Sequence, residues 1–459
     1  MRQQRFMRLT RALPAAALAL LVVGCDNVLT TTPGSNIPAD QIIVDSKSAQ
    51  GALTGAYDGL QSLSYYGLDI QLLGDLPADN STWVGTYQFL GDIENNQIAA
   101  DNPEVTDMWT AIYRQIDRDN VILSRVPDVA AIDDATKKEV MGEAYFLRAL
   151  GYSNLVKFWG AVPMPLAPVQ SADDAANYTR TPVLDVYAQI LSDLDKAAPM
   201  IGNTTDTRRA TPMAVEAIRA RVLFYRASVP GANAQADYQA ALDAANVVLA
   251  GRDTLTVPFG NLFTATGSNT AEDIFRVSFT PAEYNELGYY WLYAGRTEVR
   301  PTKELASTFA ANDLRKPYTF GPRTSGSSQL QATKWPTTIG AEHPHVIRLA
   351  EVVLIKAEAL ARLGRLAEAV DEYNKVRIRA GLPKHVLGVD VTTQADVLAA
   401  IMLERRHEFA FEGDRWPDLV RAGLAGTVKD LAKPGYVLFP IPAREVTTTN
   451  GNVTQNPDY

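Results

Sequence analysis

Two clusters in the chain combine aromatic rings with amide, carboxylate and guanidinium side chains. A sugar ring has an apolar C–H face and a polar edge, so a saccharide-binding site needs this combination of groups. The first cluster contains Trp83 and Tyr87, with Asp79, Asn80 and Asn95 close by in the sequence. The second contains Tyr289, Tyr290, Trp291 and Tyr293, with Asn285, Glu286, Arg296 and Arg300 close by.

These clusters supply the candidate ligand-binding residues. The alternative is that the rings pack their segments onto the rest of the fold, which is how most Trp and Tyr side chains are used. For any single residue this alternative is the stronger one, but we expect at least one ring in each cluster to bind ligand. The candidates are Trp83, Tyr87, Asn80, Tyr289, Tyr290, Trp291, Tyr293 and Arg296.

The segment 404–415 places seven charged side chains at helical and near-helical spacing. A catalytic pair of carboxylates is one interpretation. A glycosidase needs a carboxyl group with a raised pKa, however, whereas three arginines among four acids favour the ionised form. We therefore expect these residues to maintain the fold. They are Glu404, Arg405, Arg406, Glu408, Glu412, Asp414 and Arg415.

Other kinds of chemistry lack the residues that they require. Only His343 and His345 bring two histidines close together, and Phe411 stands where an H-E-x-x-H motif starting at His407 needs its second histidine. The sequence has no phosphate-binding G-x-x-x-x-G-K-[ST] loop and no G-x-S-x-G motif. The net charge of -9 argues against a nucleic-acid partner. We expect no metal, no other cofactor and no catalytic residue.

The N-terminus has the pattern of an export signal. Four arginines precede an apolar run that ends at Gly24, and this run is too short to span a bilayer. Cys25 follows directly and is the only cysteine in the chain, so it can form no internal disulfide. We expect residues 1–24 to be removed as a lipoprotein signal peptide and residues 25–45 to form a tether anchored by acyl chains on Cys25, although an ordinary signal with a chance cysteine is the alternative.

The remaining residues, 46–459, are expected to form one mostly α-helical domain. With 46% hydrophobic residues the chain can bury a large core, and apolar residues recur at helical spacing. Thr181-Pro182 and Thr211-Pro212 have the composition of helix starts. We expect antiparallel helix pairs at 46–62 with 106–126, 137–158 with 183–198, 212–228 with 236–250, and 346–363 with 366–380.

The last helix pair fits a tetratricopeptide unit. Its signature is Ala357 and Leu360, then Gly364 at the turn, then Ala369 and Tyr373 on the second helix. Such pairs bury their apolar faces by stacking, which predicts an α-α superhelical scaffold. Residues 64–105 and 253–345 break the helical pattern and read as long irregular insertions with a few short strands. Insertions of this length are usually functional, and both aromatic clusters fall in them.

The order of several short motifs resembles the SusD/RagB family of outer-membrane nutrient-binding lipoproteins over nearly the whole chain. The motifs are Glu143–Ala149, Gly160–Pro163, Asp313–Arg315, Ala357–Ala359 with Gly364 and Ala369, Asn374, Arg377, Arg379–Gly381, Glu404–Arg406 with Glu408, Glu412–Gly413 and Arg415, Pro440–Pro442 and Gln455–Pro457. The chain departs from the family pattern at Asn450-Gly451, and at Asp458-Tyr459 where Gly-Tyr is common. Both departures lie at its end.

The resemblance implies a tetratricopeptide scaffold with a ligand-binding face, anchored by lipid in the outer membrane and exposed at the cell surface. It implies a protein that performs no chemistry, captures an oligosaccharide or polysaccharide and delivers it to a partner TonB-dependent transporter. No family motif assigns a sugar contact to a numbered residue here. A tetratricopeptide adaptor that binds a peptide is the alternative, followed by a helical glycoside hydrolase.

Overall fold

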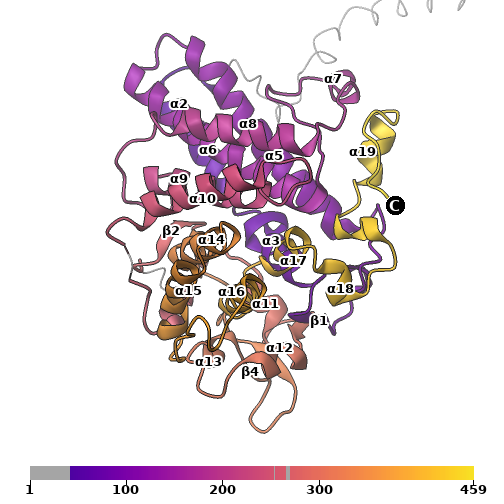
Figure 1. Cartoon of the computed structure of the whole chain (residues 1–459). Helices are drawn as coiled ribbons and strands as arrows, with labels where there is room; N and C mark the ends of the chain where they lie inside the picture. The colour runs from indigo at the N-terminus through magenta and orange to yellow at the C-terminus, as the bar shows by residue number, and fades with distance from the viewer. Residues whose placement is uncertain (1–41, 253, 265–268) are drawn as a thin grey trace, which may run out of the picture. The chain divides into compact units, whose positions relative to one another are not determined.

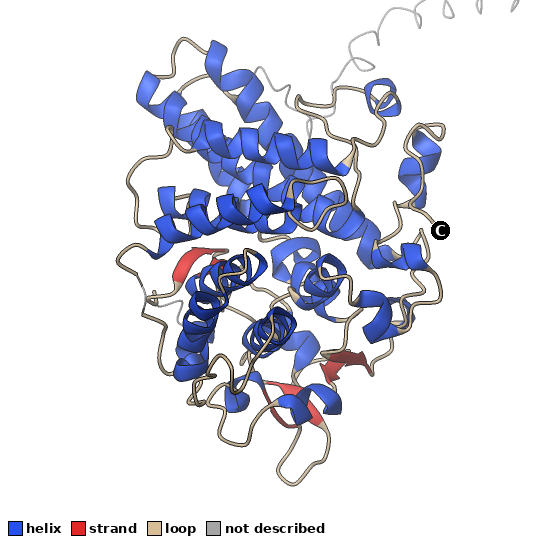
Figure 2. Cartoon of the chain, in the orientation of Figure 1, coloured by secondary structure: helices blue, strands red, loops and turns tan. Residues whose placement is uncertain are grey.

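Helix α6 (Asp134–Trp159) runs through the centre of the helical part of the protein (Figures 1 and 2). It begins at the cap residue Asp133, whose carboxylate accepts a hydrogen bond of 2.8 Å from the backbone N–H of Thr136. Sixteen of its residues are buried, so it is covered on most sides, as expected of a helix at the centre of a bundle. The computed structural model describes residues 42–252, 254–264 and 269–459, and residues 43–459 form one compact unit.

The scaffold consists of antiparallel helices that pack in successive pairs. Helix α2 packs on α5, α6 on α8, α9 on α10, and α14 on α15, while α10 also contacts α14 (Figure 1). This confirms a mostly α-helical protein with few short strands and a tetratricopeptide-like arrangement. The remaining bounds are α2 (Ser46–Gly59), α5 (Pro103–Arg125), η2 (Val126–Asp128), α7 (Ala172–Ala176), α8 (Val183–Ala197), α9 (Pro212–Arg226), α10 (Ala234–Leu249), α14 (Leu349–Arg362) and α15 (Leu366–Arg379).

Local sequence signals explain where some of these helices begin and where the chain turns between two of them. The hydroxyl of Thr211 accepts a hydrogen bond of 3.0 Å from the N–H of Ala214 and caps α9. Helix α8 also begins directly after Thr181-Pro182, as expected, but its cap residue is Pro182, and Thr181 does not cap it and instead bridges to Val162 through its backbone. Gly364 has φ +80° between α14 and α15, a conformation that side chains disfavour.

The first insertion is more helical than its sequence suggests. It contains the π-helix η1 (Leu63–Gly67), α3 (Asp69–Asp75), β1 (Ser81–Trp83) and α4 (Gln88–Glu94). Every residue of α3 is buried, including its two aspartates. A short helix that is buried all round shows no polar face, which is why its periodicity is not visible in the sequence.

The second insertion consists of short elements joined by loops. They are η3 (Phe259–Phe263), β2 (Asp273–Arg276), α11 (Leu287–Trp291), β3 (Val299–Pro301), α12 (Lys303–Thr308), α13 (Lys316–Thr319), β4 (Phe320–Pro322), β5 (Leu330–Ala332) and β6 (His345–Arg348). Within the described part of the chain, six strands form three two-stranded antiparallel sheets, which pair β1 with β3, β2 with β6, and β4 with β5. Only the last pair is a local hairpin.

The chain closes with α16 (Gln394–Phe409), α17 (Arg415–Arg421), α18 (Ala425–Lys429), η4 (Pro434–Val437) and α19 (Ala443–Thr448). Within the described residues, no helix is both long enough and apolar enough to cross a bilayer. The expected signal peptide, Cys25 and nearly all of the expected tether lie outside the described residues.

Candidate functional site

The β1–β3 pair joins the two insertions. Ser81 pairs with Pro301, Thr82 with Arg300, and Trp83 with Val299. The pairing continues past the strands, because the carbonyl oxygen of Glu298 accepts hydrogen bonds from the N–H groups of Val84 and Gly85 at 2.9 and 3.1 Å. Segments more than 200 residues apart in sequence therefore form one continuous surface.

A groove of about 600 Å³ lies beside this pair and is bordered by both insertions. We call it the inter-insertion groove. Its size is within the range of small-molecule sites. Its lining residues are Val84, Gly85, Thr86, Tyr293, Gly295, Arg296, Thr297, Glu298, Arg300, Arg323, Gln329 and Leu330.

Glu298 fixes the geometry of one side of the groove. Its carboxylate accepts hydrogen bonds from the backbone N–H groups of Thr86 and Tyr87 at 2.9 and 3.1 Å. Burial alone would raise the pKa of Glu298, but these N–H donors and the Arg296 guanidinium lower it below the ordinary value. Gly85 is required here, since a Cβ at this position would lie 1.9 Å from a carboxylate oxygen of Glu298.

Arg296 connects the two insertions through its side chain. Its Nε donates to Glu298 at 2.5 Å and one terminal nitrogen donates to the hydroxyl of Thr86 at 2.9 Å. The guanidinium also lies over the ring of Tyr87, 3.9 Å from its centre, in a cation–π contact. Phe89 stacks on the same ring with 5.1 Å between the ring centres. Tyr87 is therefore half-buried and supports the groove without lining it.

Tyr293 is the exposed ring of the groove. Its side chain is 45% exposed, and the guanidinium of Arg323 lies 3.8 Å from the ring centre. Arg323 is held in turn by Gln329, whose side-chain oxygen accepts its hydrogen bond at 2.8 Å. The groove thus places an aromatic ring next to fixed guanidinium and amide groups, which can stack on the C–H face of a sugar and hydrogen-bond its hydroxyl groups.

The candidate residues from the sequence are separated by the fold. Tyr293 and Arg296 line the inter-insertion groove, and Tyr289 is exposed close to it, with its carbonyl oxygen accepting a hydrogen bond from the N–H of Arg296 at 2.8 Å. Trp83 is half-buried and packs its ring over Gly91 of α4, where an added Cβ would lie 2.9 Å from the indole. Trp83 is not part of the groove lining.

Three candidates are buried, and direct contact with a ligand is therefore the wrong expectation for them. Trp291 is 0% exposed and packs on Phe411 with 4.6 Å between ring centres. Tyr290 is 7% exposed. Asn80 is fully buried, where its side chain donates to Asp75 and accepts from Arg406. These residues pack the insertions onto the scaffold, as the alternative interpretation of the clusters states.

Sequence reasoning missed the other half of the groove. Thr86, Glu298, Arg323 and Gln329 carry polar groups into it but do not lie within a run of aromatic residues. Arg323 and Gln329 lie at the two ends of a turn between β4 and β5. The Gly- and Ser-rich segment 325–328 is the one signal in the sequence, because it is typical of a hairpin turn.

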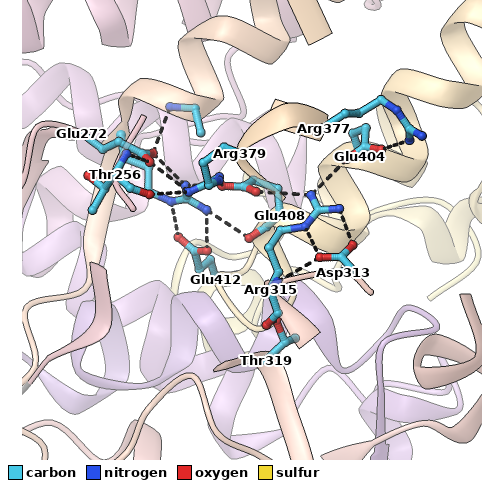
Figure 3. A network of polar contacts seen from close by, with 12 residues as sticks. Thr256, Glu272, Asp313, Arg315, Thr319, Arg377, Arg379, Glu404, Glu408 and Glu412 are labelled. Carbon is cyan, nitrogen blue, oxygen red and sulfur yellow. Dashed lines mark hydrogen bonds and ion pairs between the residues drawn. The ribbon is translucent and has the colours of Figure 1, made fainter. Parts of the chain in front are cut away.

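Three acids of the charged segment 404–415, namely Glu404, Glu408 and Glu412, belong to a buried network, which Figure 3 shows. Arg348 contacts Glu408 and Glu412 at 2.6 and 2.9 Å, and Arg315 contacts Glu404 at 3.0 Å. Arg377 and Arg379 from α15 pair with Glu404 and Glu408. The network also includes Glu272, Asp313 and Lys334, so it fastens the second insertion to α15 and α16.

The charge states in this network oppose a catalytic role. Burial would raise the pKa of Glu412, but Arg348 and Lys334 lower it to about 2. Burial also acts against ionisation of Glu408, but its arginine neighbours hold the pKa well below the ordinary value. Neither carboxyl group can serve as the protonated acid of a glycosidase at neutral pH. The expected structural role is confirmed for these two acids. The expected ionised state is wrong for Asp414, because burial and the charge of Glu351 raise its pKa to about 7.

The two neighbouring histidines have separate contacts. His345 lies 2.8 Å from the carboxylate of Asp273, and His343 accepts a hydrogen bond from the N–H of Phe279. Within the described residues, no group of three or more His, Cys, Asp or Glu side chains is arranged to hold a metal ion.

The family models and the curated relatives that match this chain are SusD-like. A model of the SusD family matches residues 303–436, and a model described as starch-binding and associating with the outer membrane matches residues 37–224. SusD-like protein P2 of Formosa agariphila is 27% identical, with 96% of this chain and 98% of that protein covered. A SusD-like protein of Bacteroides ovatus is 24% identical, with 90% and 82% covered.

Solved structures share the fold. A laminarin-binding SusD-like protein superposes with a TM-score of 0.79 at 23% identity, covering 91% of this chain and all of that chain. A SusD superfamily protein from Bacteroides vulgatus superposes with a TM-score of 0.78 at 21% identity, covering 90% of this chain and 99% of that chain.

Proposed function

Because the chain belongs to the SusD/RagB family, we propose that it is a lipid-anchored, surface-exposed outer-membrane protein that captures an oligosaccharide or polysaccharide and delivers it to a partner TonB-dependent transporter. It binds the saccharide in the inter-insertion groove and performs no chemistry on it. Family membership supports the outer-membrane location and the saccharide ligand. The transporter and the lipid anchor are part of the proposal.

The exposed ring of Tyr293 carries this proposal. Tyr293 lies beside Arg296 and Arg323, and both guanidinium groups are already held by hydrogen bonds, so they are oriented before a ligand arrives. Preorganised groups lose little conformational entropy on binding. Tyr289, which is 37% exposed, supplies a second ring beside the groove. A relative of the same fold binds laminarin, which supports a saccharide as the ligand.

Affinity gel electrophoresis with a panel of soluble polysaccharides tests the saccharide site. We expect one class of polysaccharide to retard the wild-type protein, and Tyr293→Ala to abolish the retardation without changing Tm. Tyr318→Ala is the matched control, since Tyr318 is 40% exposed but lies outside the groove lining, and it should behave as the wild type. If Tyr293→Ala still binds the polysaccharide, the saccharide site lies elsewhere on the protein.

The anchor and the transporter need a separate test. In the native host, Cys25→Ala should move the protein from the membrane fraction to the soluble fraction or leave it unprocessed, because acylation of this sulfur holds it in the bilayer. Co-purification of the wild-type protein from detergent-solubilised membranes should recover a TonB-dependent outer-membrane protein in stoichiometric amount. Unchanged membrane fractionation of Cys25→Ala in cells lacking the co-purified transporter contradicts the anchor.

A further inference from the structure

A second cleft lies on the helical side of the protein, over α5. It has a volume of about 550 Å³ and is lined by α5, by the loop that follows α6, by α7 and by α19. Figure 1 shows α7 and α19 well apart from β1 and β4, which border the inter-insertion groove. We call this second cavity the α5 cleft. It shares no lining residue with the inter-insertion groove.

The floor of the α5 cleft is aromatic and apolar. Tyr113 is the half-buried ring of this floor, and the buried Trp109 lies against it on α5 with 4.8 Å between the ring centres. Pro163 and Pro165, which are also buried, line the same surface. The hydroxyl of Tyr113 donates to the carbonyl oxygen of Pro163 at 2.6 Å, so the ring is fixed in place. Tyr178 adds a half-buried ring on the α7 side.

Charged groups of both signs surround this floor without being paired to each other. Among the described residues, the exposed guanidinium groups of Arg114 and Arg444 and the half-buried carboxylate of Glu445 make no side-chain hydrogen bond or ion pair, although the charge of Arg444 acts to lower the pKa of Glu445. Asp117 makes only one long contact, of 3.4 Å, with the N–H of Val169. A partly buried carboxylate with no partner is costly unless a ligand donates to it. Burial also raises the pKa of Glu445 and of Asp117.

The mixture of charges selects the chemistry of the ligand. An anionic ligand would approach Asp117 and Glu445, and a cationic ligand would approach Arg114 and Arg444, so either would meet like charge. A neutral ligand with many hydroxyl groups can donate to the carboxylates, accept from the guanidinium groups and lay an apolar face on the rings. The lining contains no strand, so an extended peptide has no edge on which to form a ladder.

We infer that the α5 cleft is a second binding site for a neutral saccharide, independent of the inter-insertion groove. A smaller cavity of about 340 Å³ next to α5 is lined by the same Arg114 and Arg118 and by the exposed Tyr284. A polymer that leaves the α5 cleft can therefore continue into this cavity. Two sites on one molecule raise the apparent affinity for a long chain without any new contact at either site.

Fluorine NMR of protein labelled with 5-fluorotryptophan reports on this cleft, because Trp109 lies in its floor. The chain has six tryptophans, and Trp109→Phe identifies the resonance by its loss. The probes are linear neutral hexasaccharides of β-1,3-glucan, α-1,4-glucan and β-1,4-mannan at millimolar concentration. An anionic galacturonate hexamer, a cationic glucosamine hexamer and a peptide pool from digested casein complete the set.

We expect at least one neutral hexasaccharide to shift the Trp109 resonance more than either charged hexamer. The shift should persist in Tyr293→Ala and require about tenfold more sugar in Arg114→Ala and in Tyr178→Ala, two side chains whose removal disturbs no described hydrogen bond. The inference fails if no neutral sugar shifts Trp109, if only the peptide pool does, or if Tyr293→Ala removes the shift. Gel retardation that depends on Tyr293 tests the inter-insertion groove separately. The two proposed binding sites can therefore be refuted independently of each other.

Discussion

The guanidinium carbon of Arg296 lies 3.9 Å from the centre of the Tyr87 ring, so one insertion closes against the other at this contact. Arg296 also bonds Thr86 and Glu298, and each of these groups belongs to the frame of the groove. The residue therefore holds two walls together and also lines the groove with its guanidinium group.

Replacement of Arg296 tests this double role. Arg296→Ala should lower saccharide affinity more than tenfold, because both the donor and the contact with Tyr87 are lost. Arg296→Lys keeps the charge but not the planar fork, and should recover only part of the affinity. Isothermal titration with the polysaccharide identified by gel retardation gives both values. Equal affinity of the Lys variant and the wild type would show that charge alone matters.

Gly85→Ala should disrupt the groove from the backbone. The added Cβ would lie 1.9 Å from the Glu298 carboxylate, so the β1–β3 connection must shift. We expect loss of saccharide retention together with a lower Tm. Gly51→Ala is the matched control, because nothing lies within 4 Å of a Cβ there and the position is helical, so it should raise stability by up to about 1 kcal/mol. Unaltered binding in Gly85→Ala would show that this wall is not rigid.

Trp291 and Tyr293 should separate stability from binding. Trp291→Ala removes a fully buried ring and should lower the free energy of unfolding by about 3–5 kcal/mol, with loss of binding as a secondary effect. Tyr293→Ala removes an exposed ring and should change stability by less than about 0.5 kcal/mol while abolishing retention. Urea denaturation and gel retardation on the same samples provide the comparison. A stable Trp291→Ala protein that fails to bind would return Trp291 to the ligand site.

The ion network should set the acid limit of stability. The pKa of Glu412 is about 2 in the folded protein and near 4.5 when unfolded, so the unfolded state binds the proton first as the pH falls. About 3 kcal/mol of stability is therefore present above pH 4.5 and lost as the pH falls toward 2.

Glu412→Gln should be less stable at pH 7 and lose less between pH 5 and pH 2 than the wild type does. Urea denaturation at several pH values measures this. Parallel pH curves for the two proteins would contradict the assignment.

A second group of buried carboxyl groups should make the protein less stable as the pH rises. Asp69 is buried against Glu104, and burial followed by the charge of Asp107 raises the pKa of Glu104 to about 7. Glu286 also faces the pair. The folded state therefore keeps a proton that the unfolded state has released, and stability falls as the pH rises from about 4.5 to about 7.

Glu104→Gln should remove this loss. We expect the variant to be more stable than the wild type at pH 8 by about 1–3 kcal/mol, with the difference shrinking toward pH 4.5. Thermal unfolding followed by circular dichroism across this range checks the sign, and Asp58→Asn, an exposed carboxylate in α2, serves as the control. A variant that is less stable than the wild type at pH 8 would overturn the shared proton.

The scaffold could be predicted from the sequence because its signals are local. Helical periodicity, the cap at Thr211 and the turn at Gly364 each act within a few residues, and the structure has helices at those places. The aromatic clusters lie in the two insertions, and both insertions border the inter-insertion groove. Which rings are exposed depends on contacts made over long sequence distances, such as Trp291 with Phe411, and no local pattern encodes them.

The groove was harder to predict for the same reason. Arg323 reaches Tyr293 only because β4 and β5 form a hairpin, and Glu298 reaches Thr86 only because β1 pairs with β3. The family resemblance predicted the architecture and the type of ligand, but it could not assign the ligand contacts to particular residues. The α5 cleft was not predicted, because its lining comes from four separate segments of the chain.

The pairing of Ser81 with Pro301 also determines when the binding face can form. Contacts at such sequence separation are slow to form, because the loop between them must be closed before the strands gain any hydrogen bond. Neighbouring helices of the scaffold meet over much shorter distances. During refolding, helical circular dichroism should therefore recover before saccharide binding does, and a ribosome must synthesise the chain beyond residue 301 before the groove has its second wall.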